Sequence, residues 1–307
     1  MQRRLGAAGF SPAAGGQAGV YCSVTEACVR RFQLARGLRT DGSCDEPTWA
    51  ALVEASWRPG DRMLFLTSPN LRGDDIAELQ ARLGRIGFDC GRVDGILGPR
   101  TARAIEEFQG NCGLPADGVC GSETLQTVER VSRQTGTGPG IATVRERERL
   151  RTSPASLAGR RIVVGQFGGL SMLTRALARD LRRRGAVVIS VDEPDSIAQA
   201  EAANQFGADL YVGFEALTEG PSRICYYAVP TFESTGGRSL AERIAVELRA
   251  LPTPPPQVSG MRLQVLRETR MPAVLTSFSS VRSTIDHSIE VARLVRVAIE
   301  HWVAQPL

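Results

Sequence analysis

The chain has 307 residues, which is long enough for two or three domains, and its 42% hydrophobic and 23% charged content is ordinary for globular domains. All 37 basic residues are arginine, and the net charge of +4 is spread along the sequence. The densest basic stretch, residues 145–151, is interleaved with Glu146 and Glu148, which argues against a nucleic-acid-binding protein.

No apolar run approaches the roughly 20 residues that a membrane-spanning helix needs, so we expect no membrane span. The first ten residues, MQRRLGAAGF, contain two arginines but no apolar run of signal-peptide length. The sequence as it stands therefore predicts a cytoplasmic protein. The sequence begins part-way into its first repeat unit. A start codon further upstream could therefore add a signal peptide and change the predicted location.

Cysteine usage argues against a structural metal site. The chain has seven cysteines without a CxxC pair, and it has two histidines. A structural zinc site takes four closely spaced cysteine or histidine ligands, which this pattern does not supply. We therefore expect reduced, mostly buried cysteines and no cofactor.

An internal repeat occupies the first 130 residues. Phe32 and Gln33 recur 76 positions later as Phe108 and Gln109. The same offset relates several further pairs: Thr25 and Thr101, Gly37 and Gly113, Leu38 and Leu114, Asp41 and Asp117, Gly42 and Gly118, Cys44 and Cys120, and Thr48 and Thr124. So many matches at one offset indicate two copies of one structural unit.

A finer repeat lies inside the second unit, where the motif DGxxGxxT occurs twice, at residues 94–101 and at 117–124. An Asp-Gly pair favours a tight turn, the second glycine tolerates a positive φ, and the threonine can cap the helix that follows. Apolar residues at helical spacing flank the first of these turns: Ile76, Leu79, Leu83 and Ile86 before it, and Ala104, Ile105 and Phe108 after it. We therefore expect small helical modules in which Phe108 and Gln109 serve packing and capping.

These residues resemble the PG_binding_1 family of three-helix peptidoglycan-binding modules. The copy at residues 70–132 matches the family pattern nearly throughout, whereas the copy at 1–57 is degenerate. In the degenerate copy, Ala18 stands for the aspartate of the first turn and Cys22 for its second glycine. The resemblance implies two modules of the same fold.

Residues 133–158 are rich in glycine, proline and charge, and they predict an interdomain linker with one helical turn around residues 144–150. From residue 159 onward, strands and helices alternate, which predicts an α/β domain with a mostly parallel sheet. The expected strands are 161–165, 186–191, 208–214, 225–229, 263–266 and 273–278, and the expected helices are 170–184, 196–206, 238–251 and 285–302.

The segment 159–307 resembles the Amidase_3 family of zinc-dependent N-acetylmuramoyl-L-alanine amidases. The resemblance rests on residues 162–169, 203–204, 207–215, 239–241, 266–267, 271–275 and Asp286. In that family, a histidine after the first strand binds zinc, a glutamate ligand follows on a loop, a second histidine follows a later strand, and a glutamate acts as general base. The resemblance therefore directs attention to these four positions.

None of the four positions keeps its functional residue. Phe167 and Glu215 stand at the two histidine ligands, Ser277 stands at the general base, and the loop with the glutamate ligand is deleted. Catalytic zinc needs about three protein ligands and an open position for water. The resemblance thus implies a pseudoenzyme, without metal or catalytic residues, whose cleft is lined by Phe167, Gly168, Gly169, Asn204, Glu215 and Ser277.

A nucleophilic site formed by Ser277, Asp286 and His287 is disfavoured, because two adjacent helical residues point about 100° apart. Two PG_binding_1 modules before an amidase-like domain resemble the actinobacterial CwlM family. That resemblance implies a regulator of peptidoglycan biosynthesis, whose partner is the enolpyruvyl transferase that begins precursor synthesis or a peptidoglycan fragment. The alternatives are a sensor of muropeptides or lipid-linked precursors, and an active amidase.

Overall fold

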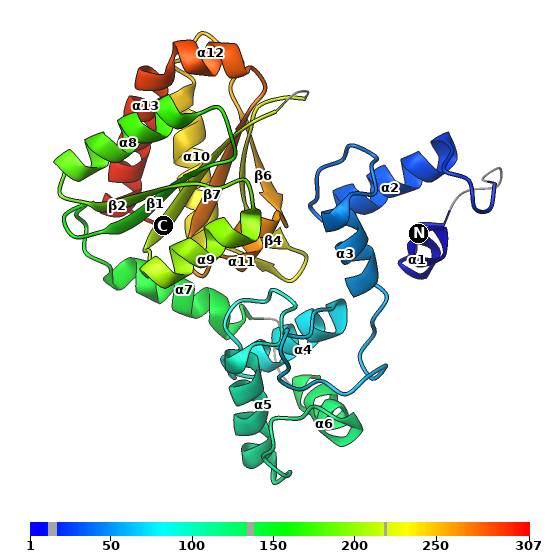
Figure 1. Cartoon of the computed structure of the whole chain (residues 1–307). Helices are drawn as coiled ribbons and strands as arrows, with labels where there is room; N and C mark the ends of the chain where they lie inside the picture. Colours follow the sequence, from blue (N-terminus) through cyan, green and yellow to red (C-terminus); the bar gives the residue numbers. More distant parts are fainter. Residues whose placement is uncertain (12–16, 134–137, 218–219) are drawn as a thin grey trace. The chain divides into compact units, whose positions relative to one another are not determined.

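The computed structural model describes residues 1–11, 17–133, 138–217 and 220–307, which form two compact units, Met1–Arg145 and Glu146–Leu307. Figure 1 shows a helical unit, in blue to green, and an α/β unit, in green to red. Within the described residues, no helix combines the length and the apolar character that crossing a membrane requires. Multidomain architecture with helical modules and an α/β domain is thereby confirmed.

The helical unit contains two three-helix modules, as the repeat predicts. The first consists of α1 (Gln2–Ala7), α2 (Ser23–Ala35) and α3 (Glu46–Glu54), and the second of α4 (Asp74–Arg85), α5 (Pro99–Cys112) and α6 (Ser122–Ser132). Each has its own apolar core. In both cores two phenylalanine rings meet edge to face at 5.4 Å, Phe10 with Phe32 and Phe88 with Phe108.

A buried glutamine organises each DGxxGxxT turn. The Gln109 side chain donates to the Asp117 carboxylate at 2.8 Å, to the Val119 carbonyl at 3.0 Å and to the Thr124 hydroxyl at 3.2 Å, and it accepts from the Gly118 N–H at 2.9 Å. One amide group therefore contacts four polar groups of the turn, with three acceptors around its two N–H donors and one donor at its oxygen. We refer to this arrangement as the glutamine cradle.

The cradle recurs in three other turns of the two modules. Gln33 holds the turn at Asp41 and Gly42, and Gln80 holds the turn at Asp94 and Gly95, with the same four kinds of contact. In the degenerate turn, Gln2 donates to the Thr25 hydroxyl and the Val20 carbonyl and accepts from the Gly19 N–H. This first turn has therefore kept its fold although the aspartate and the second glycine of the motif are gone.

Two details of the motif prediction are wrong. The second glycine has a negative φ, −94° at Gly98 and −87° at Gly121, because it is the N-cap residue of the next helix, where the backbone is extended. Positive φ belongs to the first glycine, 71° at Gly118 and 73° at Gly95. The threonine does not cap the helix, since its hydroxyl is engaged by the glutamine cradle.

None of the seven cysteines is in a disulfide, and four of them are buried, as expected: Cys28, Cys90, Cys120 and Cys225. Burial raises the pKa of the Cys120 thiol to about 12. Cys44, at the equivalent repeat position, is partly buried and its pKa is also raised by burial. This shared position therefore holds a small, unreactive core residue.

The segment predicted as a linker contains more structure than one helical turn. Its residues 134–137 lie outside the described residues, but helix α7 (Ile141–Thr152) has twelve residues, and the boundary between the two units falls within it. Glu146 accepts from the Ser234 hydroxyl at 2.6 Å and from the backbone N–H groups of Thr235 and Gly236 at 3.0 and 3.2 Å. This carboxylate thus neutralises the N-terminal end of helix α10 (Thr235–Leu248) within the α/β unit.

The α/β unit is built on one mixed, mostly parallel sheet, as predicted. Its strands are β1 (Arg161–Gln166), β2 (Val187–Asp192), β3 (Leu210–Ala216), β4 (Arg223–Val229), β5 (Phe232–Glu233), β6 (Gln257–Met261) and β7 (Ala273–Phe278). The strand order is β2-β1-β3-β7-β4-β5, with β6 also paired to β4. Strands β2, β1, β3 and β7 are parallel neighbours, and β4 runs antiparallel to β7.

Helices cover both faces of this sheet (Figure 1). Helices α8 (Ser171–Arg183), α10 and α13 (Ser288–Ala304) pack together on one face and bury the main apolar cluster. Helices α9 (Ser196–Phe206) and α11 (Gln264–Glu268) pack together on the other face. Because β1, β3 and β7 run parallel, their carboxyl ends meet at the same end of the sheet. This end is where parallel α/β sheets bind their ligands.

Two predicted elements of this unit are wrong. Residues 263–266 were expected as a strand, but α11 occupies this place and the strand is β6, just before it. The strand was missed because it contains Gly260, and glycine has a low strand propensity. Glycine is needed there, since a Cβ would come within 2.7 Å of the Ala228 Cβ on β4. The long helix 285–302 is divided into α12 (Val281–Asp286) and α13, because His287 leaves the helical conformation between them.

The glutamine cradle predicts a stability effect that packing alone does not. Replacement of Gln109 with alanine should lower the protection of the α5 and α6 amides about ten- to a hundredfold in hydrogen exchange, because a loss of about 1–3 kcal/mol follows when buried partners lose their hydrogen bonds. The exposed Gln126 on α6 gives the matched control, and Gln126→Ala should leave exchange unchanged. Equal effects of the two substitutions would contradict the role of the cradle.

Candidate functional site

The candidate site lies where β1, β3 and β7 end. The sheet register pairs Gln166 with Phe214, and Glu215 with Ser277. Phe167 follows Gln166 directly, and its backbone N–H donates to the Phe214 carbonyl at 3.1 Å. The structure therefore brings Phe167, Glu215 and Ser277 to neighbouring strand ends.

Glu215 and Ser277 are hydrogen-bonded to each other. The Ser277 hydroxyl donates to the Glu215 carboxylate at 2.5 Å, and Ser277 and Glu215 are only 3% and 6% exposed, respectively. The rings of Phe214 and Phe278, the neighbouring residues along β3 and β7, stack at 6.3 Å in the main apolar cluster on the other face of the sheet. A buried carboxylate needs hydrogen-bond donors, and the serine supplies one from the adjacent strand.

The loop after β1 is short and held from within. Gln166 accepts from the N–H groups of Gly168 and Leu170 at 3.2 and 2.9 Å and donates to the Ser171 hydroxyl at 3.1 Å. Gly168 and Gly169 have φ values of 118° and 73°, a region that favours glycine. Helix α8 starts at Ser171, so the connection has no length for an additional ligand-bearing loop.

A second polar network, not predicted from the sequence, links β3 and α9 to the end of β1. The Tyr211 hydroxyl donates to the Gln199 side chain at 2.7 Å, and Gln199 donates to the Gln166 carbonyl at 2.7 Å. Burial, and then the charge of Glu215, raise the pKa of Tyr211, so this phenol stays neutral. A Cβ at Gly165 would come within 2.5 Å of the Tyr211 hydroxyl oxygen. Glycine in an otherwise β-branched strand was the available signal for this network.

Asn204 lies elsewhere. Its side chain donates to the Glu268 carbonyl at 2.9 Å and accepts from the Arg270 N–H at 2.9 Å. These residues precede β7, whereas Ser277 is near the carboxyl end of that strand. The structure thus places Asn204 at the opposite end of the sheet, where it ties α9 to the entrance of β7. Of the six residues predicted to line the cleft, it alone is not near the others.

The donor set does not fit a zinc ion. Phe167 has no donor atom, Ser277 is a poor ligand, and Glu215 is the one carboxylate, already bound to Ser277. Across the described ranges, no group of three or more His, Cys, Asp or Glu side chains is arranged to hold a metal. His287 Nδ1 is 2.8 Å from the Ser283 carbonyl, and His301 pairs with Glu247 at 3.4 Å, so both histidines have local structural partners.

Comparison with known proteins reveals similarity in both units. The family model for a putative peptidoglycan binding domain matches residues 1–52 and 72–128. The N-acetylmuramoyl-L-alanine amidase CwlM of Mycobacterium tuberculosis is 34% identical over an alignment of 310 positions, which covers 90% of this chain and 75% of that protein. The N-acetylmuramoyl-L-alanine amidase CwlL of Bacillus licheniformis is 32% identical over an alignment of 144 positions, which covers 40% of each chain.

The spore cortex-lytic enzyme of Bacillus subtilis is 46% identical over 57 residues, 18% of this chain and 19% of that enzyme. Among solved structures, the N-acetylmuramoyl-L-alanine amidase of Clostridium difficile 630 matches 48% of this chain and 99% of its own, with a TM-score of 0.40 at 15% identity.

The Glu215–Ser277 pair leads to a testable expectation. Ser277→Ala should destabilise the α/β unit by about 1–3 kcal/mol, since it removes a donor from a buried carboxylate. Removing both partners, in Ser277→Ala/Glu215→Leu, should recover part of this loss. Hydrogen exchange of the β3 and β7 amides measures both, with the exposed Ser279→Ala as control. A double variant less stable than the sum of the single variants would rule out the pairing.

Proposed function

The chain belongs to the family of the N-acetylmuramoyl-L-alanine amidase CwlM, and on this basis we propose that it is a non-catalytic regulator of peptidoglycan biosynthesis. The proposal combines two properties: an amidase-like α/β unit whose strand ends lack catalytic chemistry, and two modules of the peptidoglycan-binding type.

The observation that carries the proposal is the buried hydrogen bond between Ser277 and Glu215. Zinc-dependent amide hydrolysis needs a metal to polarise the carbonyl and lower the pKa of a water, and a base to take up its proton. Here the base position is a hydroxyl that donates to the residue at a ligand position. The two groups satisfy each other, and neither is directed toward a substrate.

The remaining framework supports binding. Gly168 and Gly169 are exposed at the strand ends, Phe167 is half-buried beside them, and the loop is held rigidly by Gln166. A preformed edge with an aromatic side chain and exposed backbone can recognise a ligand without transforming it. We place the protein in the cytoplasm, with the enolpyruvyl transferase of precursor synthesis as its partner.

A sensor of muropeptides or lipid-linked precursors is the second candidate, and the same exposed glycines favour it. In this second candidate, the muropeptide or precursor binds at residues 167–169 and alters the affinity of the chain for the enolpyruvyl transferase. The two candidates are compatible, because a regulator can carry its own metabolite site.

The catalytic part of the proposal is tested by metal analysis and amidase assay. Purified full-length chain should contain no stoichiometric zinc and should release no L-alanyl peptides from peptidoglycan, because the donor set of Phe167, Glu215 and Ser277 cannot hold the ion. Bacillus licheniformis CwlL, assayed under the same conditions, is the positive control. Peptide release that a chelator abolishes would overturn the proposal.

The regulatory part is tested with the purified enolpyruvyl transferase of the same organism. We expect a complex on size-exclusion chromatography and a higher turnover rate when the chain is added. Addition of a muramyl peptide then separates the two candidates: a change in the stimulated rate identifies a sensor, and an unchanged rate identifies a regulator without this input. Absence of both complex and stimulation would rule out this partner.

A further inference from the structure

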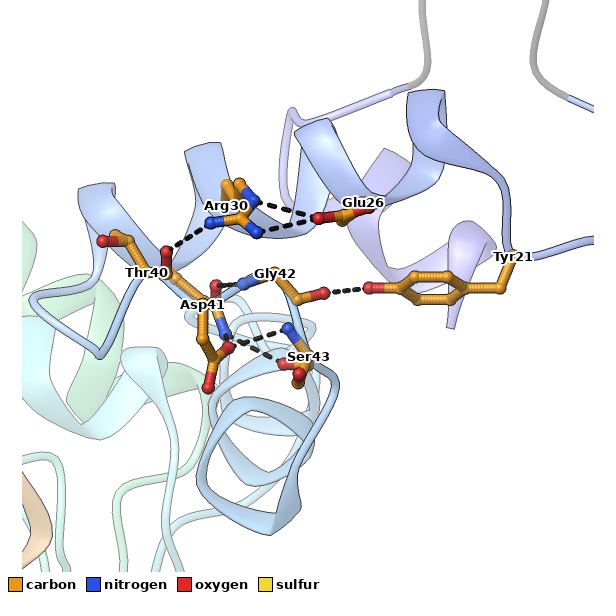
Figure 2. Close-up of polar contacts among 8 residues, drawn as sticks. Tyr21, Glu26, Arg30, Thr40, Asp41, Gly42 and Ser43 are labelled. Carbon is orange, nitrogen blue, oxygen red and sulfur yellow. Dashed lines mark hydrogen bonds and ion pairs between the residues drawn. The ribbon is translucent and has the colours of Figure 1, made fainter. Parts of the chain in front are cut away.

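The two helical modules share their fold but differ on one face. In the first module, three side chains from α2 and the segment before it lie against the turn formed by residues 40–43 (Figure 2). They are Tyr21, Glu26 and Arg30. We refer to this face, formed by the helix surface and the turn beside it, as the turn face.

In the first module the turn face is filled by the module itself. Arg30 donates to the Glu26 carboxylate at 2.8 and 3.2 Å and to the Thr40 carbonyl at 2.9 Å. The Tyr21 hydroxyl donates to the Gly42 carbonyl. A Cβ at Gly42 would meet both Arg30 Nε and Glu26 Cγ at 2.8 Å, so these side chains cover the glycine. Two carbonyl oxygens of the turn are thus occupied by donors from the same module.

In the second module the same positions carry different chemistry. At the repeat offset of 76, Tyr21 corresponds to Leu97, Glu26 to Ala102 and Arg30 to Glu106. Leu97 is buried in the core, and the short side chain of Ala102 does not cover the turn. A Cβ at Gly118 would meet only the Ala102 carbonyl oxygen, at 3.5 Å. The turn face of the second module is therefore open.

The open face presents hydrogen-bond acceptors. Within the described residues, the carbonyl oxygens of Ala116 and Gly118 have no protein partner, whereas their counterparts at residues 40 and 42 do. Glu106 adds an exposed carboxylate at the position from which Arg30 reaches the turn. Asp117 adds a second negative charge, since the Val119 N–H and then the Gln109 side chain lower its pKa. A carboxylate next to free carbonyls favours a cationic donor.

In the first module a guanidinium occupies the turn face, bound to a carboxylate and to a turn carbonyl. The second module offers the same two kinds of acceptor without the guanidinium. Peptidoglycan stem peptides offer a comparable group, the free side-chain amine of their diamino acid. We propose that the second module binds this ammonium group between Glu106 and the carbonyls of Ala116 and Gly118, and that the first module does not, since Arg30 and Tyr21 fill its turn face. This inference rests on the proposed role in peptidoglycan biosynthesis and assigns its ligand contact to one module.

Titration of the full-length chain with a muramyl tripeptide that ends in meso-diaminopimelate tests the inference. We expect one binding site per chain, with amide chemical-shift changes confined to residues 102–106 and 116–119. The same peptide acetylated on its free amine should bind at least about fivefold more weakly, because the charge that pairs with Glu106 is removed. Glu106→Gln should weaken binding of the free peptide similarly, and the neighbouring exposed Glu107→Gln should not.

Exchanging the turn faces provides the reciprocal test. Ala102→Glu/Glu106→Arg rebuilds the ion pair of the first module on the second and should abolish binding. Tyr21→Leu/Glu26→Ala/Arg30→Glu should open the first module and raise the stoichiometry to two. All the exchanged residues are at least partly exposed, but Tyr21→Leu also removes a hydrogen bond to the turn, so amide spectra must first show that the modules remain folded.

Equal binding of the free and acetylated peptides would overturn the inference, as would undiminished binding by the Ala102→Glu/Glu106→Arg variant or no binding at all. These outcomes are separable from failure of the proposed function. Zinc content, amidase activity and the complex with the enolpyruvyl transferase are measured without the peptide, and they stand or fall independently.

Discussion

The hydrogen bond from Ser277 to Glu215 determines what the edge of this sheet can do. The parallel register of β3 and β7 places the two residues opposite each other, and both are almost fully buried. A carboxylate in such a place must be satisfied by a neighbour, and here the neighbour is Ser277 on the adjacent strand. Once these two groups are paired, both side chains are part of the packed interior.

Much of the α/β unit could be predicted from periodicity, because its central strands are β-branched runs and its helices carry apolar residues at regular spacing. Strands β1, β3 and β7, and helix α9, lie where the pattern puts them. The errors arose where tertiary contacts override local preference. Gly260 is required by the closeness of β4, and α7 has a single buried apolar residue, so its helix depends on the contacts of Glu146 rather than on an amphipathic pattern.

The candidate site shows the same division. Phe167, Glu215 and Ser277 were identified through the family resemblance, and they lie close together because parallel strands end at the same side of the sheet. Asn204 was grouped with them through the same resemblance, but its real partners, in the segment before β7, have no sequence signature. The hydrogen bond from Tyr211 was missed because a contact between a strand and a helix on one face leaves no periodic trace. Only the glycines that make room for the tyrosine ring marked the place.

The glutamine cradle has a consequence for how a duplicated module can evolve. One interior side chain fixes each turn, so the outward-facing residues of the neighbouring helix contribute little to folding and are free to drift after duplication. The degenerate first turn, which has lost its motif aspartate and still closes around Gln2, shows how much drift the scaffold withstands. Two copies in one polypeptide can therefore acquire unrelated surfaces while sharing an ancestral interior. Selection can change the surface of one module without affecting the folding of the other.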